Sequence, residues 1–381
     1  MASPDQKLVL RPRLQSAEYL LRPTLAEVDL EAIAHNFGQV RSIAGAEVLA
    51  VVKADAYGHG AVPVVERLER AGAKGFAVAL AEEAIELRDA GVRSPILILN
   101  GVVGGAHREV LERDLVPVVY DLGELEAFQA ASNGDFRVHL KVDTGMARLG
   151  VPMTELPAFL EAMAAMPGLV LSGLMTHLAA ADTDDEFTDG QLERFDEAIA
   201  MVRAAGYTPS IHAANSPGAL RFERARYDMV RAGIALYGEA GFSPSEIQLK
   251  PALRLRTRVI SVRHLATGER AGYDCAFVAK RPTRLAVLPI GYADGVFRSM
   301  VGGGEVLVGG QRCPYVGRIS MDLSHVDVTD VPGAKVGDEV VLLGGQGDEM
   351  LHARELAEAA GTIAYEIMTS ISRRVPRFYS S

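Results

Sequence analysis

Lys53 stands at the end of a short apolar run, a position at which an amine can take part in chemistry. The run Val48–Val52 is apolar and largely β-branched, and the glycine-containing loop Ala54–Gly60 follows the lysine directly. This pattern predicts a buried strand that ends at Lys53. Burial disfavours the charged amine, and a neutral lysine forms Schiff bases with aldehydes. Lys53 is therefore a candidate for covalent catalysis, although a lone lysine at a strand end more often just reaches solvent.

Other polar residues end apolar runs further along the chain. In order, these strand-end residues are Lys141, Asp143, His177, Asn215, Ser216 and Arg231. If the strands are parallel and form a barrel, their carboxyl ends lie together and make the active-site face. The sequence therefore predicts one site built from residues that are far apart in the chain.

Lys141 raises an electrostatic question. In the run Arg137–Asp143, apolar and polar residues alternate, so His139, Lys141 and Asp143 share one face, which we expect to line the barrel interior. Arg148 follows closely, and like charges at short range cost energy. We therefore expect either an anion between the two cations or a neutral or modified Lys141.

The loops after the last two predicted barrel strands contain parts suited to binding phosphate. One loop reads Asn215-Ser216-Pro217-Gly218 and the other Arg231-Ala232-Gly233-Ile234. Glycines let backbone N–H groups approach an anion, and Ser216 is a donor at a helix start. Each loop taken alone is weak evidence, since Asn-Ser-Pro-Gly is more often simply a turn. Together with a candidate Schiff-base lysine, the two loops point to pyridoxal 5'-phosphate (PLP), which needs an amine, a phosphate cup and a partner for its ring nitrogen.

The elements that must position these residues alternate between strand and helix patterns. Amphipathic segments such as Ala61–Ala71 and Gln191–Ala205 separate most of the apolar runs. Eight such runs occur: Val48–Val52, Gly75–Leu80, Pro95–Asn100, Leu115–Tyr120, Arg137–Asp143, Leu169–His177, Ser210–Asn215 and Met229–Tyr237. Eight βα units predict a (β/α)8 TIM barrel over residues 23–242. A doubly wound open sheet is the structural alternative, and the count of eight with polar strand ends favours the barrel.

From residue 243 onward the pattern changes. Segments such as Leu253–His264, Thr283–Pro289, Gly304–Val308 and Val340–Leu343 read as strands separated by glycine and proline turns, and a helix pattern returns only at Ala353–Ala360. Residues 243–381 therefore form a predicted β-rich C-terminal domain. A strand at Leu8–Leu10, within residues 1–22, is a possible addition to it.

Composition excludes several classes of protein. The formal net charge is -10 and no basic tract is present, which argues against a nucleic-acid partner. No apolar run reaches membrane-spanning length, and residues 1–13 lack the apolar stretch of a signal sequence. Two cysteines, Cys275 and Cys313, cannot build a disulfide framework and suit a reducing cytoplasm. We expect a cytoplasmic protein with a small-molecule substrate and no metal in its site.

The segment Ala50-Val-Val-Lys-Ala-Asp-Ala-Tyr-Gly-His-Gly60 resembles the cofactor-lysine signature of bacterial alanine racemases, which are fold type III PLP enzymes. Further ordered motifs extend the likeness over all but about the first twenty residues. They are Leu140–Gly150, Met175–Ala179, Ala214–Ser216, Val230–Gly238, Ile290–Gly295, Gly317–Asp322 and Thr362–Glu366. The resemblance implies a PLP-dependent isomerase that interconverts L-alanine and D-alanine and supplies D-alanine for peptidoglycan.

The resemblance also implies a two-base mechanism in a homodimer with shared active sites. Lys53 would hold the cofactor and move the α-proton on the D face of the substrate. Tyr273, supplied by the partner subunit, would be the opposing base on the L face. Bases on both faces of one carbon are what racemisation needs, provided that their pKa values fall towards the working pH.

The remaining roles follow from the same resemblance. Arg231 would face the pyridine nitrogen, and His177 would link it to Tyr273. Lys141 would be carbamylated, which would supply the anion expected beside Arg148. The residues assigned to the cofactor phosphate and its loop are Tyr57, Asn215, Ser216, Gly233, Ile234 and Tyr365. Those assigned to the substrate are Arg148, which would also meet the phenolic oxygen of PLP, Met321 through its backbone N–H, and Tyr292 at the entrance, with Arg298, Arg318 and Asp182 further out. His59, His139 and His212 are expected to be structural or to support the site indirectly.

Two positions depart from the family pattern. Position 55 is Asp where the family usually has Asn, and Asp274 follows Tyr273 where the family usually has Gly. Both changes leave the reaction type intact, but they make the pKa of Lys53, the rate and the substrate breadth harder to infer.

Three other functions compete with alanine racemisation. A broader small-amino-acid racemase that also accepts serine uses the same residues. An amino-acid decarboxylase on the same scaffold usually places a carboxylate at the pyridine nitrogen, so Arg231 disfavours it. A non-catalytic PLP carrier needs no opposing base, so Tyr273, Tyr292 and Met321 disfavour it.

Overall fold

The chain contains two compact units. The computed structural model describes residues 21–102, 104–242 and 247–380. One unit is Leu30–Ala252, and the other combines the described residues up to Asp29 with Leu253–Ser380. The predicted division between residues 242 and 243 adjoins residues 243–246, which lie outside the described part, and it stays a prediction.

The first unit is built on eight parallel strands. Their spatial order is β10-β2-β3-β4-β5-β6-β8-β9, and a short β7 (Val151–Pro152) pairs with β6. The strands are β2 (Glu47–Val51), β3 (Phe76–Val78), β4 (Ile96–Ile98), β5 (Val116–Val119), β6 (Phe136–Asp143), β8 (Leu169–Met175), β9 (Ser210–His212) and β10 (Met229–Ala232). All eight coincide with the predicted apolar runs. Runs rich in Val, Ile and Leu suit parallel strands because both faces of such strands are covered.

The strands close into a nearly complete barrel with a seam between β9 and β10. Two backbone hydrogen bonds bridge the seam, from Asp228 N to Ile211 O at 3.1 Å and from Arg231 N to Ala214 O at 2.9 Å. The sheet therefore curls back on itself, as an open doubly wound sheet does not. The predicted (β/α)8 architecture is confirmed.

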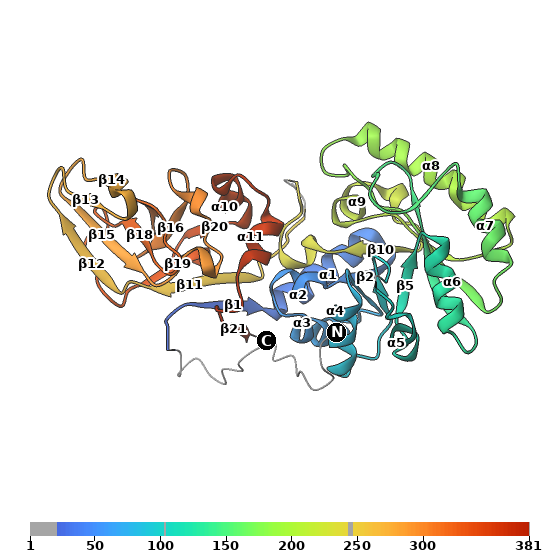
Figure 1. The fold of residues 1–381 in the computed structure, drawn as a ribbon. Helices are drawn as coiled ribbons and strands as arrows, with labels where there is room; N and C mark the ends of the chain where they lie inside the picture. The colour runs from blue at the N-terminus through green and yellow to red at the C-terminus, as the bar shows by residue number, and fades with distance from the viewer. Residues whose placement is uncertain (1–20, 103, 243–246, 381) are drawn as a thin grey trace. The chain divides into compact units, whose positions relative to one another are not determined.

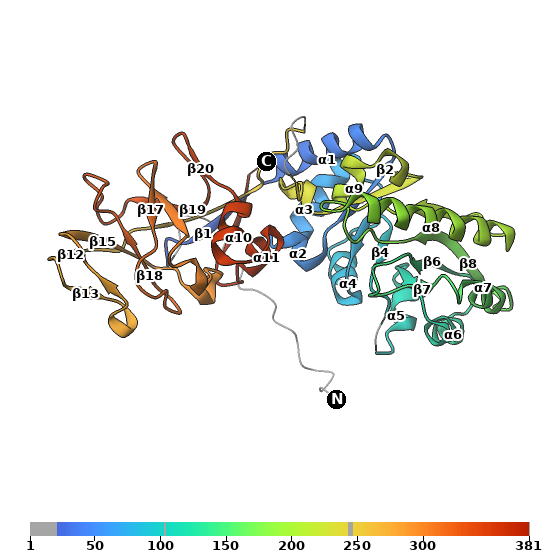
Figure 2. The same ribbon diagram turned by 90° about the horizontal axis from the view of Figure 1, so that it is seen from above.

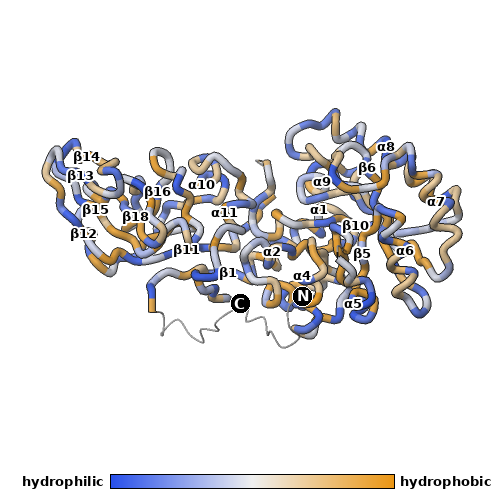
Figure 3. Tube along the Cα trace, in the orientation of Figure 1, coloured by the Kyte–Doolittle hydropathy of each residue, from blue (hydrophilic) through white to orange (hydrophobic). Residues whose placement is uncertain are grey.

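Helices surround the barrel strands (Figures 1 and 2). They are α1 (Leu30–Ala44), α2 (Lys53–Tyr57), α3 (Ala61–Arg70), α4 (Ala81–Asp89), α5 (His107–Glu112), α6 (Leu122–Ala131), α7 (Leu156–Ala164), α8 (Asp185–Ala204) and α9 (Ser216–Arg221), with the short turns η2 (Glu223–Ala225) and η3 (Ile234–Tyr237). In α8 the buried Leu192, Phe195, Ile199 and Val202 recur at helical spacing. In Figure 3 apolar colour gathers on the strands, with more polar colour on the outer loops.

The second unit is rich in β-structure, as predicted. Its largest sheet has the order β17-β16-β19-β11-β1-β21, with β20 paired to β19, and two smaller sheets have the orders β12-β15-β18 and β13-β14. The strands are β1 (Leu25–Asp29), β11 (Leu253–Arg258), β12 (Ser261–Leu265), β13 (Arg270–Ala271), β14 (Phe277–Val278), β15 (Thr283–Leu288), β16 (Glu305–Val308), β17 (Gln311–Pro314), β18 (Ser324–Asp327), β19 (Glu339–Gln346), β20 (Glu349–Leu351) and β21 (Arg377–Ser380). Its helical segments are η4 (Tyr273–Cys275), η5 (Tyr292–Asp294), η6 (Arg298–Met300), α10 (Ala353–Ala360) and α11 (Ala364–Ser370).

The first strand of the described residues belongs to this sheet. It is β1, which pairs antiparallel with β11 and parallel with β21. The predicted strand at Leu8–Leu10 lies outside the described residues. Within the described ranges, no helix has both the length and the apolar character needed to cross a membrane.

Candidate active site

The carboxyl ends of the barrel strands bring the predicted polar residues to one end of the first unit. Lys53 follows β2, Lys141 and Asp143 lie on β6, and His177 follows β8. Asn215 and Ser216 begin α9 after β9, and Arg231 lies on β10. This is the end at which (β/α)8 enzymes carry their active sites.

Lys53 opens a turn of unusual handedness. The residues from Ala54 to Tyr57 all have φ between 51° and 55°, so α2 is one turn of left-handed helix. Left-handed conformation costs about 1–2 kcal/mol per residue for ordinary side chains. Backbone hydrogen bonds from Ala56 N to Val52 O and from Gly58 N to Ala54 O, both 2.9 Å, hold the turn.

Two carboxylates brace this turn from outside. Asp55 Oδ1 accepts from Ala61 N at 2.8 Å, at the start of α3, where a negative charge is favoured. Glu83 Oε1 accepts from Ala54 N at 2.6 Å, and its Oε2 accepts from Ala79 N at 2.7 Å. The acidic residue at position 55 is therefore a bracing group, and Asp also tolerates left-handed backbone better than most residues. Glu83 was not predicted, although its position three residues into α4 is a capping signal.

Arg231 is a buried cation, and no carboxylate of the described residues pairs with it. It is 2% exposed, and its Nη2 donates to Thr176 O and Ala213 O, both at 2.8 Å. Its Nη1 contacts His212 Nδ1 at 2.9 Å, and its Nη2 contacts His177 Nδ1 at 3.4 Å. Burial lowers the pKa of Arg231 to about 9, which still leaves it charged at neutral pH. Its Nε has no hydrogen-bond partner among the described residues, so one donor remains for a ligand.

The contacts of Arg231 determine which ring nitrogen carries the proton in three histidines. Arginine only donates, so Nδ1 of His177 and Nδ1 of His212 both accept, and each ring carries its proton on Nε2. His212 Nε2 then donates to His139 Nδ1, 2.9 Å away. Burial and the charge of Arg231 lower the pKa values of all three histidines, which keeps the rings neutral. Hydrogen bonds thus link His139 and His212 to Arg231, and their indirect support of the site stays a prediction.

Positive charge is concentrated at this end of the barrel. Burial, followed by the charge of Arg148, lowers the pKa of Lys53. Burial, followed by Arg231 and Arg148, lowers the pKa of Lys141 to about 8. Asp143 offsets part of this lowering, and its Oδ1 accepts from the backbone of residues 145–147 at 2.9–3.2 Å. Lys141 is 4% exposed and has no ion-pair partner among the described residues, so the site calls for anions.

A cup suited to phosphate lies beside Arg231. Asn215 caps α9 by accepting from Gly218 N at 3.0 Å, and Ser216 Oγ accepts from Gly233 N at 2.9 Å. A Cβ at position 233 would stand 2.4 Å from Tyr57 Oη, so only glycine lets the tyrosine hydroxyl approach. Ile234 follows as the first residue of η3. The predicted phosphate residues of the first unit thus come together.

Gln191 connects two of the strand ends, and the sequence did not single it out. It is fully buried on α8, accepts from Ala179 N at 2.8 Å and donates to His177 O at 3.1 Å. Its Nε2 also reaches Thr144 Oγ1 at 3.3 Å. Gln191 therefore fixes the backbone of His177. A polar residue on the buried stripe of an amphipathic helix was the available signal.

The other predicted site residues belong to the second unit. Tyr273, in η4, is 69% exposed. Asp274 has φ 59°, and its Oδ2 lies 2.5 Å from Arg318 Nε. The departure at position 274 therefore supplies an ion pair to a loop residue while keeping a backbone conformation that glycine would adopt easily. Tyr365 lies on α11.

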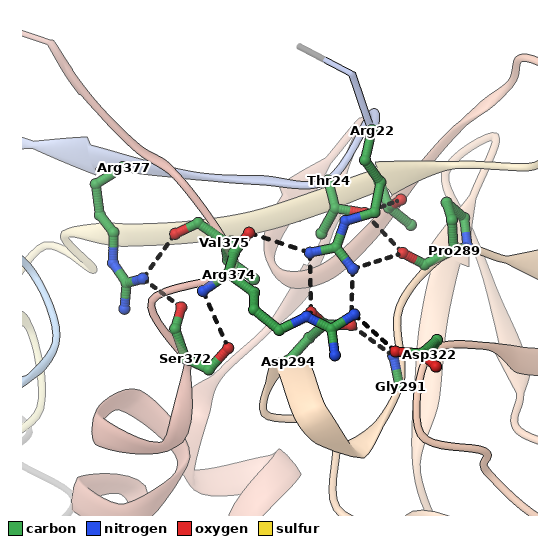
Figure 4. Close-up of polar contacts among 11 residues, drawn as sticks. Arg22, Thr24, Pro289, Gly291, Asp294, Asp322, Ser372, Arg374, Val375 and Arg377 are labelled. Atoms are coloured by element: carbon green, nitrogen blue, oxygen red, sulfur yellow. Dashed lines mark hydrogen bonds and ion pairs between the residues drawn. The ribbon is translucent and has the colours of Figure 1, made fainter. Parts of the chain in front are cut away.

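The backbone segments of Tyr292 and Met321 are hydrogen-bonded to each other. A buried ion network around Asp294 supports them, and Figure 4 shows its polar contacts. Tyr292 N donates to Ser320 O at 3.0 Å. Asp294 is fully buried in η5, and its two carboxylate oxygens accept hydrogen bonds from the guanidinium of Arg22 at 2.9 and 2.8 Å. Arg374 Nε lies 3.3 Å from Asp294 Oδ1. Arg374 also donates to Asp322 Oδ1 at 2.7 Å. The network ties the turn of Tyr292 to the loop of Met321, and bidentate pairing compensates the buried charge.

Comparisons with known proteins agree over most of the chain. The alanine racemase N-terminal domain family matches residues 28–241, and the alanine racemase C-terminal domain family matches residues 252–379. An alanine racemase of Sorangium cellulosum is 48% identical over an alignment of 379 residues that covers 94% of this chain and 99% of that protein. The structure of alanine racemase from Streptomyces coelicolor is 36% identical, with a TM-score of 0.91 over 96% of this chain and 100% of the other. That of alanine racemase from Bartonella henselae, with covalently bound pyridoxal phosphate, is 32% identical, with a TM-score of 0.88 over 94% and 99%.

Proposed function

The chain belongs to the alanine racemase family, and from that premise we propose how its own residues carry out the reaction. It is an isomerase that interconverts L-alanine and D-alanine, the general source of D-alanine for peptidoglycan, and its family depends on PLP. What remains to be assigned is the role of each residue.

The barrel end fits PLP. Lys53 offers an amine whose pKa burial lowers, and Ser216, Gly233 and Tyr57 surround a place for the phosphate. Arg231 keeps one donor, Nε–H, for the ring nitrogen. When bound, PLP draws electrons from the amino acid and so makes its α-proton acidic enough to remove.

The proposal that this site racemises alanine rests mainly on Arg231. A guanidinium keeps its proton, so the ring nitrogen that it faces stays unprotonated and draws electrons less strongly than it would beside a carboxylate. The weaker pull suits proton exchange at one carbon and disfavours decarboxylation or transamination. In the part of the chain that the structure describes, no acidic residue is hydrogen-bonded to Arg231, and this supports racemisation over amino-acid decarboxylation.

Two residues move the proton in the proposal. Lys53 Nζ removes or returns it on the D face, and Tyr273 Oη does so on the L face from the partner subunit. His177 accepts from Arg231 at Nδ1, so its Nε2–H is free to donate to the oxygen of Tyr273 and to stabilise its charged form. Arg148 and the backbone N–H of Met321 bind the substrate carboxylate, Tyr292 narrows the entrance, and Asn215, Ile234 and Tyr365 complete the phosphate binding.

The proposed assembly is a homodimer with shared sites. Three residues assigned to the substrate side, Tyr273, Tyr292 and Met321, are 69%, 42% and 51% exposed. Large apolar groups at such exposure are typical of surfaces that a partner covers. A cytoplasmic location is also proposed, because both cysteines are free and one of them is exposed. Cell fractionation with compartment markers tests the location.

The reaction itself is tested with single enantiomers. Purified enzyme loaded with PLP should convert either L-alanine or D-alanine to the same equal mixture, measured by chiral chromatography, with no release of carbon dioxide. The Lys53→Ala variant is the control. Serine, supplied in parallel, measures the substrate breadth. Carbon dioxide release without isomerisation would establish a decarboxylase instead.

A substitution in the phosphate cup should weaken cofactor binding. In Gly233→Ala the new methyl group displaces Tyr57 Oη, which the wild-type geometry places 2.4 Å from that Cβ position. Borohydride reduction followed by peptide mapping should label Lys53 fully in the wild type and at least tenfold less in Gly233→Ala at limiting PLP, since one lost charge-assisted hydrogen bond is worth about 1.5–3 kcal/mol.

The matched control is Gly38→Ala, at a helical glycine with no atom within 4 Å of the added Cβ. It should label like the wild type and unfold at a slightly higher temperature. Label on Lys141 in place of Lys53 would overturn the assignment of the cofactor lysine.

Lys141 should be carbamylated. A lowered pKa leaves a larger fraction of the amine neutral than in an ordinary lysine, and the neutral amine attacks carbon dioxide, forms an N–C bond and releases a proton to solvent. Protein prepared with ¹³C-bicarbonate should show one carbamate carbon resonance, absent in Lys141→Ala. That variant should lose most activity and recover part of it with acetate. Lys74→Ala, at an exposed ion pair, is the control. A resonance that survives in Lys141→Ala would contradict the assignment.

Without the modification, Lys141 makes stability depend on pH. Its pKa is about 8 in the folded protein against 10.5 as the ordinary value, so the unfolded chain binds more protons between these limits. The bicarbonate-free protein should therefore gain stability as the pH rises from about 8 to 10.5. Melting curves with and without bicarbonate, compared with those of Lys141→Ala, measure this.

A further inference from the structure

A cavity lies at the amino-terminal end of the barrel strands, opposite the end that carries the candidate active site. Its volume is about 300 Å³. Its lining includes Glu47 and Val116, the first residues of β2 and β5, and Met229, the first residue of β10. The interior of a (β/α)8 barrel is normally filled by layers of side chains. An opening of this size is therefore a departure from ordinary packing, and it falls within the range of small-molecule sites.

The cavity walls are apolar except at two places. Leu49, Leu97 and Val116 are among the apolar residues that line it. Glu47 and Lys74 form an ion pair of 2.5 Å, and both side chains are more than half exposed, so they face solvent at its rim. The other polar lining residue is His139. A charged molecule would lose its hydration against such walls without gaining a partner inside.

The ring of His139 occupies its place because of a glycine. Gly173 pairs with His139 on the neighbouring strand β8, and a Cβ at position 173 would stand 2.3 Å from His139 Nδ1. The neighbouring His212 holds the same nitrogen at 2.9 Å. The ring is therefore clamped on one side, while the remaining nitrogen, Nε2, has no hydrogen-bond partner among the described residues.

The proton on that nitrogen is determined by Arg231. Because Arg231 donates to His212 Nδ1, His212 donates from Nε2 to His139 Nδ1, and His139 must keep its own proton on Nε2. His139 thus presents an N–H donor, and not an acceptor, to the cavity that it lines. A donor in an apolar wall selects for an acceptor on the molecule that fills the space, since leaving the donor unmatched costs free energy.

We propose that this cavity is a second binding site, for a small uncharged ring compound with one hydrogen-bond acceptor, which takes the Nε2–H of His139. An apolar protein cavity of about 150 Å³ binds benzene, so the larger volume here admits a substituted or two-ring molecule. The same chain of donors connects the occupant with Arg231, which lies at the other end of the barrel interior.

Three probes of nearly the same shape separate the contributions of apolar contact, hydrogen bonding and charge to binding. They are 4-ethylpyridine, which has an acceptor, ethylbenzene, which has none, and 4-ethyl-N-methylpyridinium, which is charged. Binding to the PLP-loaded enzyme at pH 8.5, where 4-ethylpyridine is uncharged, is followed by titration calorimetry and ligand-observed NMR. We expect 4-ethylpyridine to bind about 3- to 10-fold more tightly than ethylbenzene, the ratio that one net hydrogen bond supplies. The cation should not bind.

Variants locate the site. Val116→Phe and Met229→Trp fill the cavity from half-buried wall positions outside the catalytic machinery, so both should abolish binding while racemisation continues. His139→Phe removes the donor and should make 4-ethylpyridine and ethylbenzene bind equally. Circular dichroism checks that each variant is folded, and one folded filling variant is enough to locate the site.

The absorption spectrum of bound PLP is a further readout. Occupancy should shift the absorption band of bound PLP in the wild type and not in Val116→Phe. Equal binding of 4-ethylpyridine and ethylbenzene to the wild type would overturn the role of His139. Absence of binding, or binding that survives both filling variants, would overturn the site itself.

Discussion

Mixing two inactive variants should restore racemisation. Lys53→Ala subunits lack the base for the D face, and Tyr273→Phe subunits lack the base for the L face. If Tyr273 enters the partner's site, a mixed dimer has one site with both bases and one site with neither. Random exchange of equal amounts makes half of all dimers mixed, so activity should rise from near zero to about a quarter of the wild-type value. Each variant alone should fall by at least about 10²–10⁴-fold, the usual loss for a positioned general base.

The control for subunit exchange is a pair of variants that cannot complement. Lys53→Ala mixed with Lys53→Arg leaves every site without the proper lysine and should stay inactive. Native mass spectrometry of differently tagged subunits verifies that mixed dimers form. If verified mixed dimers of Lys53→Ala and Tyr273→Phe remain inactive, then Tyr273 serves the site of its own chain.

The second large effect is a difference between L-alanine and D-alanine in the exchange of the α-proton. Tyr273→Phe should slow exchange of the α-proton of L-alanine with deuterated water by about 10²–10⁴-fold, because only the phenol oxygen serves the L face. Exchange of D-alanine should persist, since Lys53 still removes that proton. Net racemisation must fall equally in both directions, because the equilibrium constant of two enantiomers is fixed. The half-reactions, followed by NMR, are therefore the informative measurement.

Tyr292→Phe is the matched control because it removes the same hydroxyl from a second tyrosine of the same unit, 42% exposed. It should change exchange from both enantiomers by a similar and small factor. Equal losses for both enantiomers in Tyr273→Phe would show that Tyr273 only shapes the site.

The sequence predicted the barrel because its eight runs are apolar, and the structure assigns a strand to each. It predicted the second unit less completely. Leu253–His264 reads as one strand, yet β11 and β12 belong to different sheets. The strands β17, β18 and β21 were missed, since short edge pairings depend on distant partners more than on local pattern. α11 was missed as well, being only seven residues long.

The predicted site residues of the barrel come together because each stands at a strand end, a property that periodicity reveals. The supporting residues Glu83 and Gln191 were overlooked because a capping position and a polar residue on a buried stripe indicate a local role, and their distant backbone partners cannot be identified from the sequence. The protons on His139 and His212 were equally out of reach, since they depend on Arg231, which lies 19 residues beyond His212 in the chain. Asp55 and Asp274 stood out as departures, and only their contacts with Ala61 and Arg318 gave them roles.

The left-handed turn after Lys53 also limits how this stretch of sequence can drift over evolutionary time. Four consecutive non-glycine residues there, from Ala54 to Tyr57, together store roughly 4–8 kcal/mol of backbone strain. β-branched residues fit that conformation worst, so Val, Ile and Thr are excluded at positions 54–56 whatever their polarity. Asn, Asp and Gly are the substitutions that relieve it. If the residue types at these positions vary little among relatives, the backbone conformation is therefore a sufficient reason. An exchange between Asp and Asn at position 55 is a change that this conformation permits.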